Sequence, residues 1–313
     1  MPRFFIPDVS SWQGNLPNFS AVAADPTMVG CIIKSSQGLG PGVRTDLGHS
    51  PTWFIDNWPR VAAAGGARYG TSWFRGCYTY GTPASSGTAQ ADYMLATVER
   101  AGGWSFGDMS PAWDLEGKAW TSKQQVIDIS SQFAERIKQV LGKAPILYTG
   151  VTWRKFKITE RAGFGALWST HMNIMEPYGW PNESYVLWQF VGTGKHYNPA
   201  TVVLGFPTGV PGFPESTDMN VVVDRGSTNT TIERVREILT GRVAPPDERP
   251  QPWVPPQEER LAPREESSRR GRGEMPTPEE PPDRGGALLP LLIGTGLFVA
   301  GALIAKHVRE DLV

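Results

Sequence analysis

The segment Pro111-Ala112-Trp113-Asp114-Leu115-Glu116 decides the interpretation of this chain. It predicts the end of a buried strand, and residues i and i+2 of a strand point to the same face. Asp114 and Glu116 are therefore expected side by side, with Leu115 turned into the packing behind them. In a low-dielectric cleft one of two adjacent carboxyl groups tends to keep its proton, and such pairs are typical of enzymes that cut glycosidic bonds. On its own, an exposed Asp-x-Glu pair is the plainer interpretation.

The rest of the chain alternates strands with helices as far as residue 150, after which strands dominate. Besides the strand that carries Asp114, strands are expected at 3–9, 29–34, 67–74, 145–150, 166–168, 185–190 and 218–223, and helices at 53–64, 88–101, 121–141 and 230–239. This order predicts an α/β fold, an irregular TIM-like barrel of about five β/α units plus three further strands. In such barrels the site lies at the carboxyl ends of the strands, where we expect Asp8, Glu116 and Tyr148.

Composition excludes several classes of function. The net charge is −1, so a polyanionic partner such as nucleic acid is not indicated. Two cysteines, Cys31 and Cys77, do not form a disulfide framework; free buried thiols are the first expectation, and one bridge between neighbouring strands is the alternative. With four scattered histidines, we expect neither a metal site nor a cofactor.

The composition changes after residue 242, so we expect residues 1–242 to form the folded domain. Residues 243–284 contain 11 prolines, seven arginines and ten acidic residues, which predicts a disordered linker. Residues 285–305 carry no charge over 21 positions, which predicts one transmembrane helix, followed by a short polar tail at 306–313. The amino terminus has no signal-peptide pattern. The expected location is therefore a membrane, with the lipid bilayer as a partner and with Gly294, Gly296 and Gly301 available for helix–helix contacts.

Short motifs follow one another between about residues 4 and 240. They are Asp8-Val9-Ser10-Ser11-Trp12-Gln13-Gly14, Ile32-Ile33-Lys34-Ser35-Ser36-Gln37-Gly38, Gln90-Ala91-Asp92-Tyr93, Asp114-Leu115-Glu116, Tyr148-Thr149, Leu167-Trp168, Trp188-Gln189 and Asp218-Met219-Asn220. In this order they resemble glycoside hydrolase family 25, the muramidase-type lysozymes. The resemblance implies hydrolysis of the β-1,4 bond between N-acetylmuramic acid and N-acetylglucosamine in bacterial peptidoglycan.

The resemblance also implies roles for particular residues. Glu116 would be the general acid, Asp114 would orient the substrate or tune Glu116, and Asp8 and Asp218 would stabilise positive charge on the sugar. Attack by a carboxylate and attack by the substrate's own N-acetyl group both stay open. The predicted substrate-binding residues, for which barrel core is the alternative interpretation, are Tyr148, Trp168, Trp188 and Gln189.

The third strand departs from the family pattern, which usually ends in Tyr-His-Phe. Its counterpart is expected at Ser72-Trp73-Phe74, with Tyr69 as a shifted match.

Two other classes of function remain as alternatives. One is a barrel that binds peptidoglycan without cutting it, and the other is a membrane-embedded structural protein of a virion. A membrane-tethered hydrolase without a signal peptide favours a bacteriophage protein, held in a virion membrane or in the host cell membrane, for lysis or for local piercing of the wall.

Overall fold

The computed structural model describes residues 3–14, 17–43, 45, 48–170, 185–191, 207, 209–213, 217–223 and 231–241. The predicted linker at 243–284, the predicted transmembrane helix at 285–305 and the tail at 306–313 lie outside these residues. Among the described helices, none is both long enough and apolar enough to span a bilayer.

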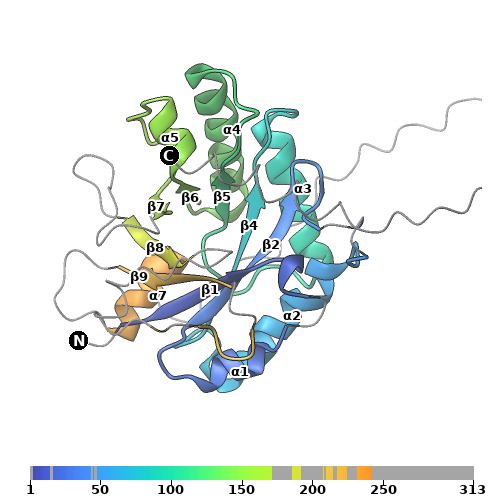
Figure 1. Cartoon of the computed structure of the whole chain (residues 1–313), viewed down its shortest axis with the longest axis vertical. Helices are drawn as coiled ribbons and strands as arrows, with labels where there is room; N and C mark the ends of the chain where they lie inside the picture. The colour runs from blue at the N-terminus through green and yellow to red at the C-terminus, as the bar shows by residue number, and fades with distance from the viewer. Residues whose placement is uncertain are drawn as a thin grey trace, which may run out of the picture. The chain divides into compact units, whose positions relative to one another are not determined.

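In the described part of the chain eight strands close into a barrel with helices on its outside (Figure 1). Around the barrel the order is β1, β2, β4, β5, β6, β7, β8 and β9, and β9 pairs with β1 to complete the ring. Their bounds are Phe5–Val9, Gly30–Gln37, Phe74–Tyr80, Ala112–Leu115, Ile146–Thr149, Ala166–Ser169, Tyr185–Val191 and Asp218–Val222. A short strand β3, Gly40–Pro41, forms a hairpin with the end of β2.

Apart from the short strand β3, the strands from β1 to β8 pair in parallel, whereas β9 runs antiparallel to both β8 and β1. Helices follow the first five long strands of the barrel: α1 Phe19–Ala24, α2 Trp53–Gly65, α3 Gly87–Arg100, α4 Lys123–Leu141 and α5 Val151–Lys155. The predicted α/β barrel of five β/α units plus three further strands is therefore confirmed within the described residues. The predicted linker and transmembrane helix stay predictions.

Local chemistry explains where the helices begin and end. The Ser122 side chain accepts a hydrogen bond from the Gln125 N–H and caps the start of α4, while Gly142 takes the left-handed conformation that ends this helix. The helix expected at 121–141 is thus confirmed. The α3 helix begins in the same way at Ser86, whose side chain accepts from the Ala89 N–H.

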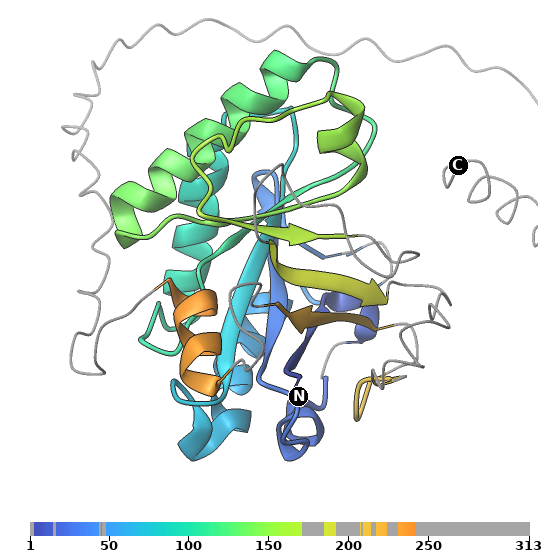
Figure 2. The ribbon, with the colours of Figure 1, turned by 90° about the vertical axis from the view of Figure 1, so that its left-hand side faces the viewer.

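The core has two layers because the side chains of each strand alternate between the two faces of the barrel wall. Inside the barrel, Ile6, Ile32, Phe74 and Ile146 pack together, and outside it the opposite residues pack against the helices. The last described helix, α7 (Ile232–Thr240), adds buried leucine and valine side chains to the inner cluster. The Leu239 carbonyl accepts from the Ser110 N–H just before β5, so α7 lies at the amino-terminal end of the strands (Figure 2). Because α7 lies at that end, the carboxyl end of the strands, at the opposite end of the barrel, is available for a functional site.

The third strand was predicted in the wrong place. Residues 67–74 were expected as a strand because they are rich in aromatic residues, but the chain forms a 3-10 helix at Gly66–Arg68 and then a turn. The Arg68 carbonyl accepts hydrogen bonds from three consecutive N–H groups, those of Thr71, Ser72 and Trp73, which holds this turn. The strand β4 begins only at Phe74 and ends at Tyr80, so Ser72-Trp73-Phe74 is not its carboxyl end.

The two cysteines are buried and free, as first expected. Cys31 and Cys77 lie on the neighbouring strands β2 and β4, where Cys77 is opposite Ile33 rather than Cys31. The bridge that the sequence left as an alternative is therefore not formed.

Candidate active site

The end of β5 delivers two carboxyl groups to the carboxyl end of the barrel. Trp113 and Leu115 face the outer core, so Asp114 faces inward, and Glu116 follows one residue beyond the strand. The backbone around them is held from several directions: the Asp114 carbonyl accepts from the Gly81 N–H at 2.8 Å, and the Glu116 carbonyl accepts from the buried Trp120 indole at 2.9 Å. The paired orientation of Asp114 and Glu116 was predicted from the alternation alone.

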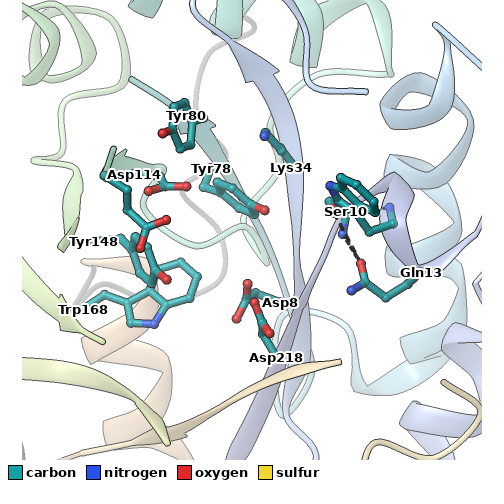
Figure 3. Close-up of a pocket in the computed structure, with 12 residues that line it drawn as sticks. Asp8, Ser10, Gln13, Lys34, Tyr78, Tyr80, Asp114, Tyr148, Trp168 and Asp218 are labelled. Atoms are coloured by element: carbon teal, nitrogen blue, oxygen red, sulfur yellow. Dashed lines mark hydrogen bonds between the residues drawn. The ribbon is translucent and has the colours of Figure 1, made fainter. Parts of the chain in front are cut away.

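The register of the parallel strands sets a row of side chains around this opening. Asp114 is opposite Tyr80 on β4 and opposite Tyr148 on β6, and Tyr148 is opposite Trp168 on β7. The Tyr148 and Trp168 rings meet edge to face, with centroids 4.6 Å apart. Figure 3 shows these residues pointing into one pocket together with Lys34 and Tyr78.

A second pair of acids comes from β1 and β9. Asp8 and Asp218 are directly opposite each other in this antiparallel pair, where side chains share a face, and Figure 3 shows their carboxyl groups together. The Asn220 amide donates to Asp8 Oδ2 at 2.8 Å and to the Ile6 carbonyl at 2.9 Å, and accepts from the Trp168 indole at 2.6 Å. This buried amide therefore fixes one acid and one aromatic wall of the pocket.

The electrostatics favour protonated acids. Burial raises the pKa of Asp8 well above its ordinary value, and the neighbouring Asp218 raises it further, while the bond from Asn220 lowers it. Burial also raises the pKa of Asp114, with Glu116 as the next cause. The pKa of Glu116 is raised by burial and lowered by the Tyr148 hydroxyl and by Lys34. Burial and the mutual repulsion of the acids therefore favour their protonated forms.

Lys34 brings a positive charge into this acidic pocket. It lies on β2 opposite Tyr78, its ammonium group lies 5.0 Å from the centre of the Tyr80 ring, and it donates to Gln37 Oε1 at 3.0 Å. Burial lowers its pKa, and the charges of Asp114 and Glu116 oppose that shift. Lys34 therefore partly neutralises the negative charge of Asp114 and Glu116, while the pKa of each stays raised.

The turn after β1 places an exposed tryptophan at the edge of the pocket. Ser10 and Gln13 cap a 3-10 helix at Ser11–Gln13 reciprocally, and the Ser10 N–H donates to Gln13 Oε1 at 2.8 Å (Figure 3). Trp12, on this short helix, lines the pocket and is 58% exposed. An exposed indole on a rigid turn offers a flat apolar surface to a ligand.

Most of the predicted site residues lie in this one pocket. Its lining includes six of them: Asp8, Asp114, Glu116, Tyr148, Trp168 and Asp218. Gln189 is fully buried behind the lining and accepts a hydrogen bond from the Tyr148 hydroxyl at 2.6 Å.

Trp188 was predicted to bind substrate, and the structure places it in the core, outside the residues that line this pocket. It is 5% exposed and packs in the outer core, where its ring lies 6.3 Å from that of Phe190. Neighbouring residues of a strand face opposite sides, so on β8 Gln189 faces the inside of the barrel and Trp188 faces outward.

Sequence reasoning missed several residues that line the pocket: Ser10, Trp12, Gln13, Lys34, Tyr78 and Tyr80. Tyr78 and Tyr80 were missed because β4 was placed too early. The alternation in Phe74-Arg75-Gly76-Cys77-Tyr78-Thr79-Tyr80, followed by Gly81, was the signal that could have found them. The third strand therefore brings Tyr78 and Tyr80 to the pocket, rather than the residues 72–74 expected from the resemblance.

The carboxyl groups of this pocket can donate a proton to an oxygen atom of a ligand and then stabilise the positive charge that develops on that ligand. Four carboxyl groups, one of them on Glu116 with a raised pKa, meet beside aromatic rings in an open pocket at the mouth of a barrel. Paired carboxyl groups with separated pKa values are the usual equipment of glycoside hydrolases.

Comparison with known proteins agrees with this class. The sequence pattern described as glycosyl hydrolases family 25 matches residues 7–198, and the chain belongs to this family. Among curated proteins, an N,O-diacetylmuramidase of Arthroderma benhamiae is 31% identical over 134 residues, which are 38% of this chain and 54% of that protein. The chain thus aligns with about half the length of this relative.

Two solved structures share the fold. The bacterial lysozyme from Streptomyces coelicolor superposes with a TM-score of 0.57 at 24% identity, over 76% of this chain and 97% of that one. The muramidase from Trichobolus zukalii gives a TM-score of 0.54 at 22% identity, over 76% of this chain and all of that one.

Proposed function

We propose that this chain is a peptidoglycan hydrolase of the N-acetylmuramidase, or lysozyme, type, which cleaves the β-1,4 bond between N-acetylmuramic acid and N-acetylglucosamine. The observation that carries the proposal is the meeting of Asp8, Asp114, Glu116 and Asp218 in one open pocket of a family 25 chain. The similarity to an N,O-diacetylmuramidase supports the choice of substrate.

In this proposal Glu116 is the general acid. Burial raises the pKa of Glu116 and so favours its protonated form, and the carboxyl proton passes to the glycosidic oxygen as the bond to the sugar breaks. The leaving sugar departs as an alcohol, and Glu116 is left ionised. In the second half of the reaction it takes a proton from the attacking water and is restored.

The other acids stabilise the sugar ring as it becomes positively charged. Asp8 and Asp218 form a pair across β1 and β9 on the side of the pocket away from β5, and whichever of the two carboxyl groups is ionised would stabilise the positive charge. Asp114 Oδ1 is buried without a hydrogen-bond partner among the described residues, so it is available to orient a donor group of the substrate. The proposal holds for attack by a carboxylate and for attack by the substrate's N-acetyl group.

The aromatic residues of the lining are proposed to bind the sugars. Tyr148 and Trp168 form one wall with their rings edge to face, Tyr78 and Tyr80 lie on β4, and Trp12 is exposed at the edge. Apolar ring faces suit the flat faces of pyranose rings, and the hydroxyl groups of the tyrosines suit their polar edges.

The test uses the full-length protein and purified bacterial cell walls. The wild-type protein should lower the turbidity of the wall suspension and release reducing sugar, and Glu116→Gln should lose at least about 100-fold of this activity because a general acid contributes that much. Glu135→Gln, on the exposed face of α4, is the matched control and should keep full activity. Wild-type protein that bound the walls and released no reducing sugar would be a binding module, and the enzymatic proposal would be wrong.

Membrane tethering is part of the proposal and rests on the sequence of residues 285–305, which lie outside the described residues. The full chain should sediment with membranes, and a chain without residues 285–305 should stay in the supernatant with its wall-cutting activity intact. A shortened chain that still sedimented, or that lost its activity, would contradict the tether.

We further propose a bacteriophage setting for the tethered enzyme. Four arginines, Arg269, Arg270, Arg272 and Arg284, lie before the apolar segment, against Lys306 and Arg309 after it, a bias that favours the hydrolase domain on the cytoplasmic side. An enzyme whose substrate lies across the membrane then acts when that membrane is breached, or is carried in a virion membrane. Detection of the protein in purified particles would support the virion role, and its restriction to infected-cell membranes would support late lysis. Its absence from both would refute the phage setting.

A further inference from the structure

Gln189 is a buried amide next to the pocket that the proposed mechanism does not use. Its side chain is fully buried, and it lies on β8 opposite Asn220, whose own amide holds Asp8 and Trp168. The Gln189 Oε1 atom accepts from the Tyr148 hydroxyl at 2.6 Å. Its Nε2 group, with two protons to donate, has no hydrogen-bond partner among the described residues. Buried amide groups normally use their donors, so this arrangement needs a reason.

The Tyr148 hydroxyl has a choice of acceptors. It lies within reach of Gln189 on one side and of the Glu116 carboxyl on the other. A hydroxyl group carries one proton, so it cannot donate to both at once. The pKa of Tyr148 is raised well above its ordinary value by burial and then by Glu116, so this proton stays on the tyrosine. What can change is therefore the acceptor to which the Tyr148 hydroxyl donates, Gln189 or Glu116.

The two directions suit the two charge states of Glu116. When Tyr148 donates to Gln189, its oxygen lone pairs can accept from a protonated Glu116. When the amide is turned over, Nε2 can donate to the Tyr148 hydroxyl oxygen. The Tyr148 proton can then be donated to an ionised Glu116, so that both Nε2 and the hydroxyl group make hydrogen bonds. A glutamine amide suits both arrangements because it carries an acceptor oxygen and a donor nitrogen, which exchange places when the amide group is turned over.

We propose that Gln189 is a positioning residue for Tyr148, and that its amide, by presenting either its oxygen or its nitrogen, directs the tyrosine hydroxyl toward or away from Glu116 as that acid gains and loses its proton. This inference rests on the proposed function in giving Glu116 two protonation states during one turnover. Gln189 itself does not touch the pocket and acts through Tyr148.

The proposal predicts how two substitutions act on Glu116. Gln189→Met keeps the length of the side chain and removes both the oxygen that accepts the Tyr148 proton and the nitrogen that can donate to the hydroxyl, so the pKa of Glu116 moves away from its wild-type value. Tyr148→Phe removes the hydroxyl, so the pKa of Glu116 rises. In the double variant Gln189→Met should have no further effect, because the residue through which it acts is gone.

The test titrates Glu116 in the full-length protein by NMR of carboxyl carbons labelled in glutamate, with the signal assigned by its loss in Glu116→Gln. The same four proteins are assayed on cell walls, where the alkaline limb of the pH profile should move with the measured pKa. No change of the Glu116 pKa in Gln189→Met, or an equal shift with and without Tyr148, would overturn the proposal. A purely structural role would lower thermal stability and activity at all pH values without moving the titration.

This design separates two failures. Wild-type protein that cuts no glycosidic bond defeats the proposed function, whereas the titration of Glu116 still shows whether Gln189 acts on it through Tyr148. An active enzyme whose Glu116 titration ignores Gln189 defeats the positioning role alone.

Discussion

Asn220 is the residue on which the geometry of the acidic pocket depends most, so Asn220→Leu is the substitution that tests it best. The fully buried amide makes three hydrogen bonds: two are donated, to Asp8 and to the Ile6 carbonyl, and one is accepted from Trp168. Leucine fills a similar volume and makes none of them. Asp8 then loses the hydrogen bond that lowers its pKa, so its pKa rises further.

The magnitude follows from the groups left behind. A bond to a charged group contributes about 1.5 to 3 kcal/mol, and a buried donor without an acceptor, here the Trp168 indole, costs about 1 to 3 kcal/mol. The new apolar side chain offsets part of this loss, by about 1 to 2 kcal/mol. Together these contributions lower the free energy of unfolding by about 0.5 to 5 kcal/mol, and a loss near the middle of that range, about 3 kcal/mol, lowers the melting temperature by about 6 to 12 °C in a domain of this size.

Chemical denaturation of the full-length protein, followed by tryptophan fluorescence, measures the stability, and wall turbidity at a series of pH values measures the activity. Asn57→Leu is the matched control, since this buried amide on α2 donates to the Trp53 carbonyl at 2.8 Å, away from the pocket. It should lower stability and leave the pH profile unchanged. Asn220→Leu with wild-type stability and an unchanged pH profile would refute the role of this amide.

Three further substitutions have defined outcomes. Lys34→Met removes a charge that lowers the pKa of Glu116, so the alkaline limb of the activity profile should move to higher pH; a downward shift would contradict this electrostatic role. Glu116→Gln should stabilise the fold at neutral pH and have no effect below about pH 4, as thermal melts at both pH values will show. The sign follows because the pKa of Glu116 is higher in the folded protein than in the unfolded chain. The wild-type protein therefore has its full stability below the unfolded pKa and loses stability as the pH rises from there through the folded pKa. Gly117→Ala should lower activity and the melting temperature, because this residue has φ +88° and an added Cβ would lie 2.5 Å from the Tyr80 hydroxyl; Gly142→Ala, at φ +69° in open space, measures the backbone cost of about 1 to 2 kcal/mol alone.

The fold could be predicted where local patterns are strong. Caps such as Ser122 and Gly142 mark the bounds of α4, and the alternation around Asp114 shows which side chains share a face. The alternation of strands and helices was enough for the class of barrel. These signals are local, so they survive without knowledge of the tertiary contacts.

The remaining features depend on tertiary contacts. Both faces of a barrel strand are buried, so β8 has no polar face to show that Trp188 points outward and Gln189 inward. The bounds of β4 were missed because the aromatic residues before Phe74 pack in a turn held by Arg68, a contact that composition does not reveal. Lys34 was quoted only as part of a motif, since its place among the acids follows from the strand order around the barrel.

The most direct test of the four-acid pocket as a muramidase is mass spectrometry of fragments released from purified peptidoglycan after reduction of their sugar ends. Wild-type protein should release fragments that end in reduced N-acetylmuramic acid, and Glu116→Gln should release none above background. Fragments that end in reduced N-acetylglucosamine, or free peptides without sugar, would contradict the assignment.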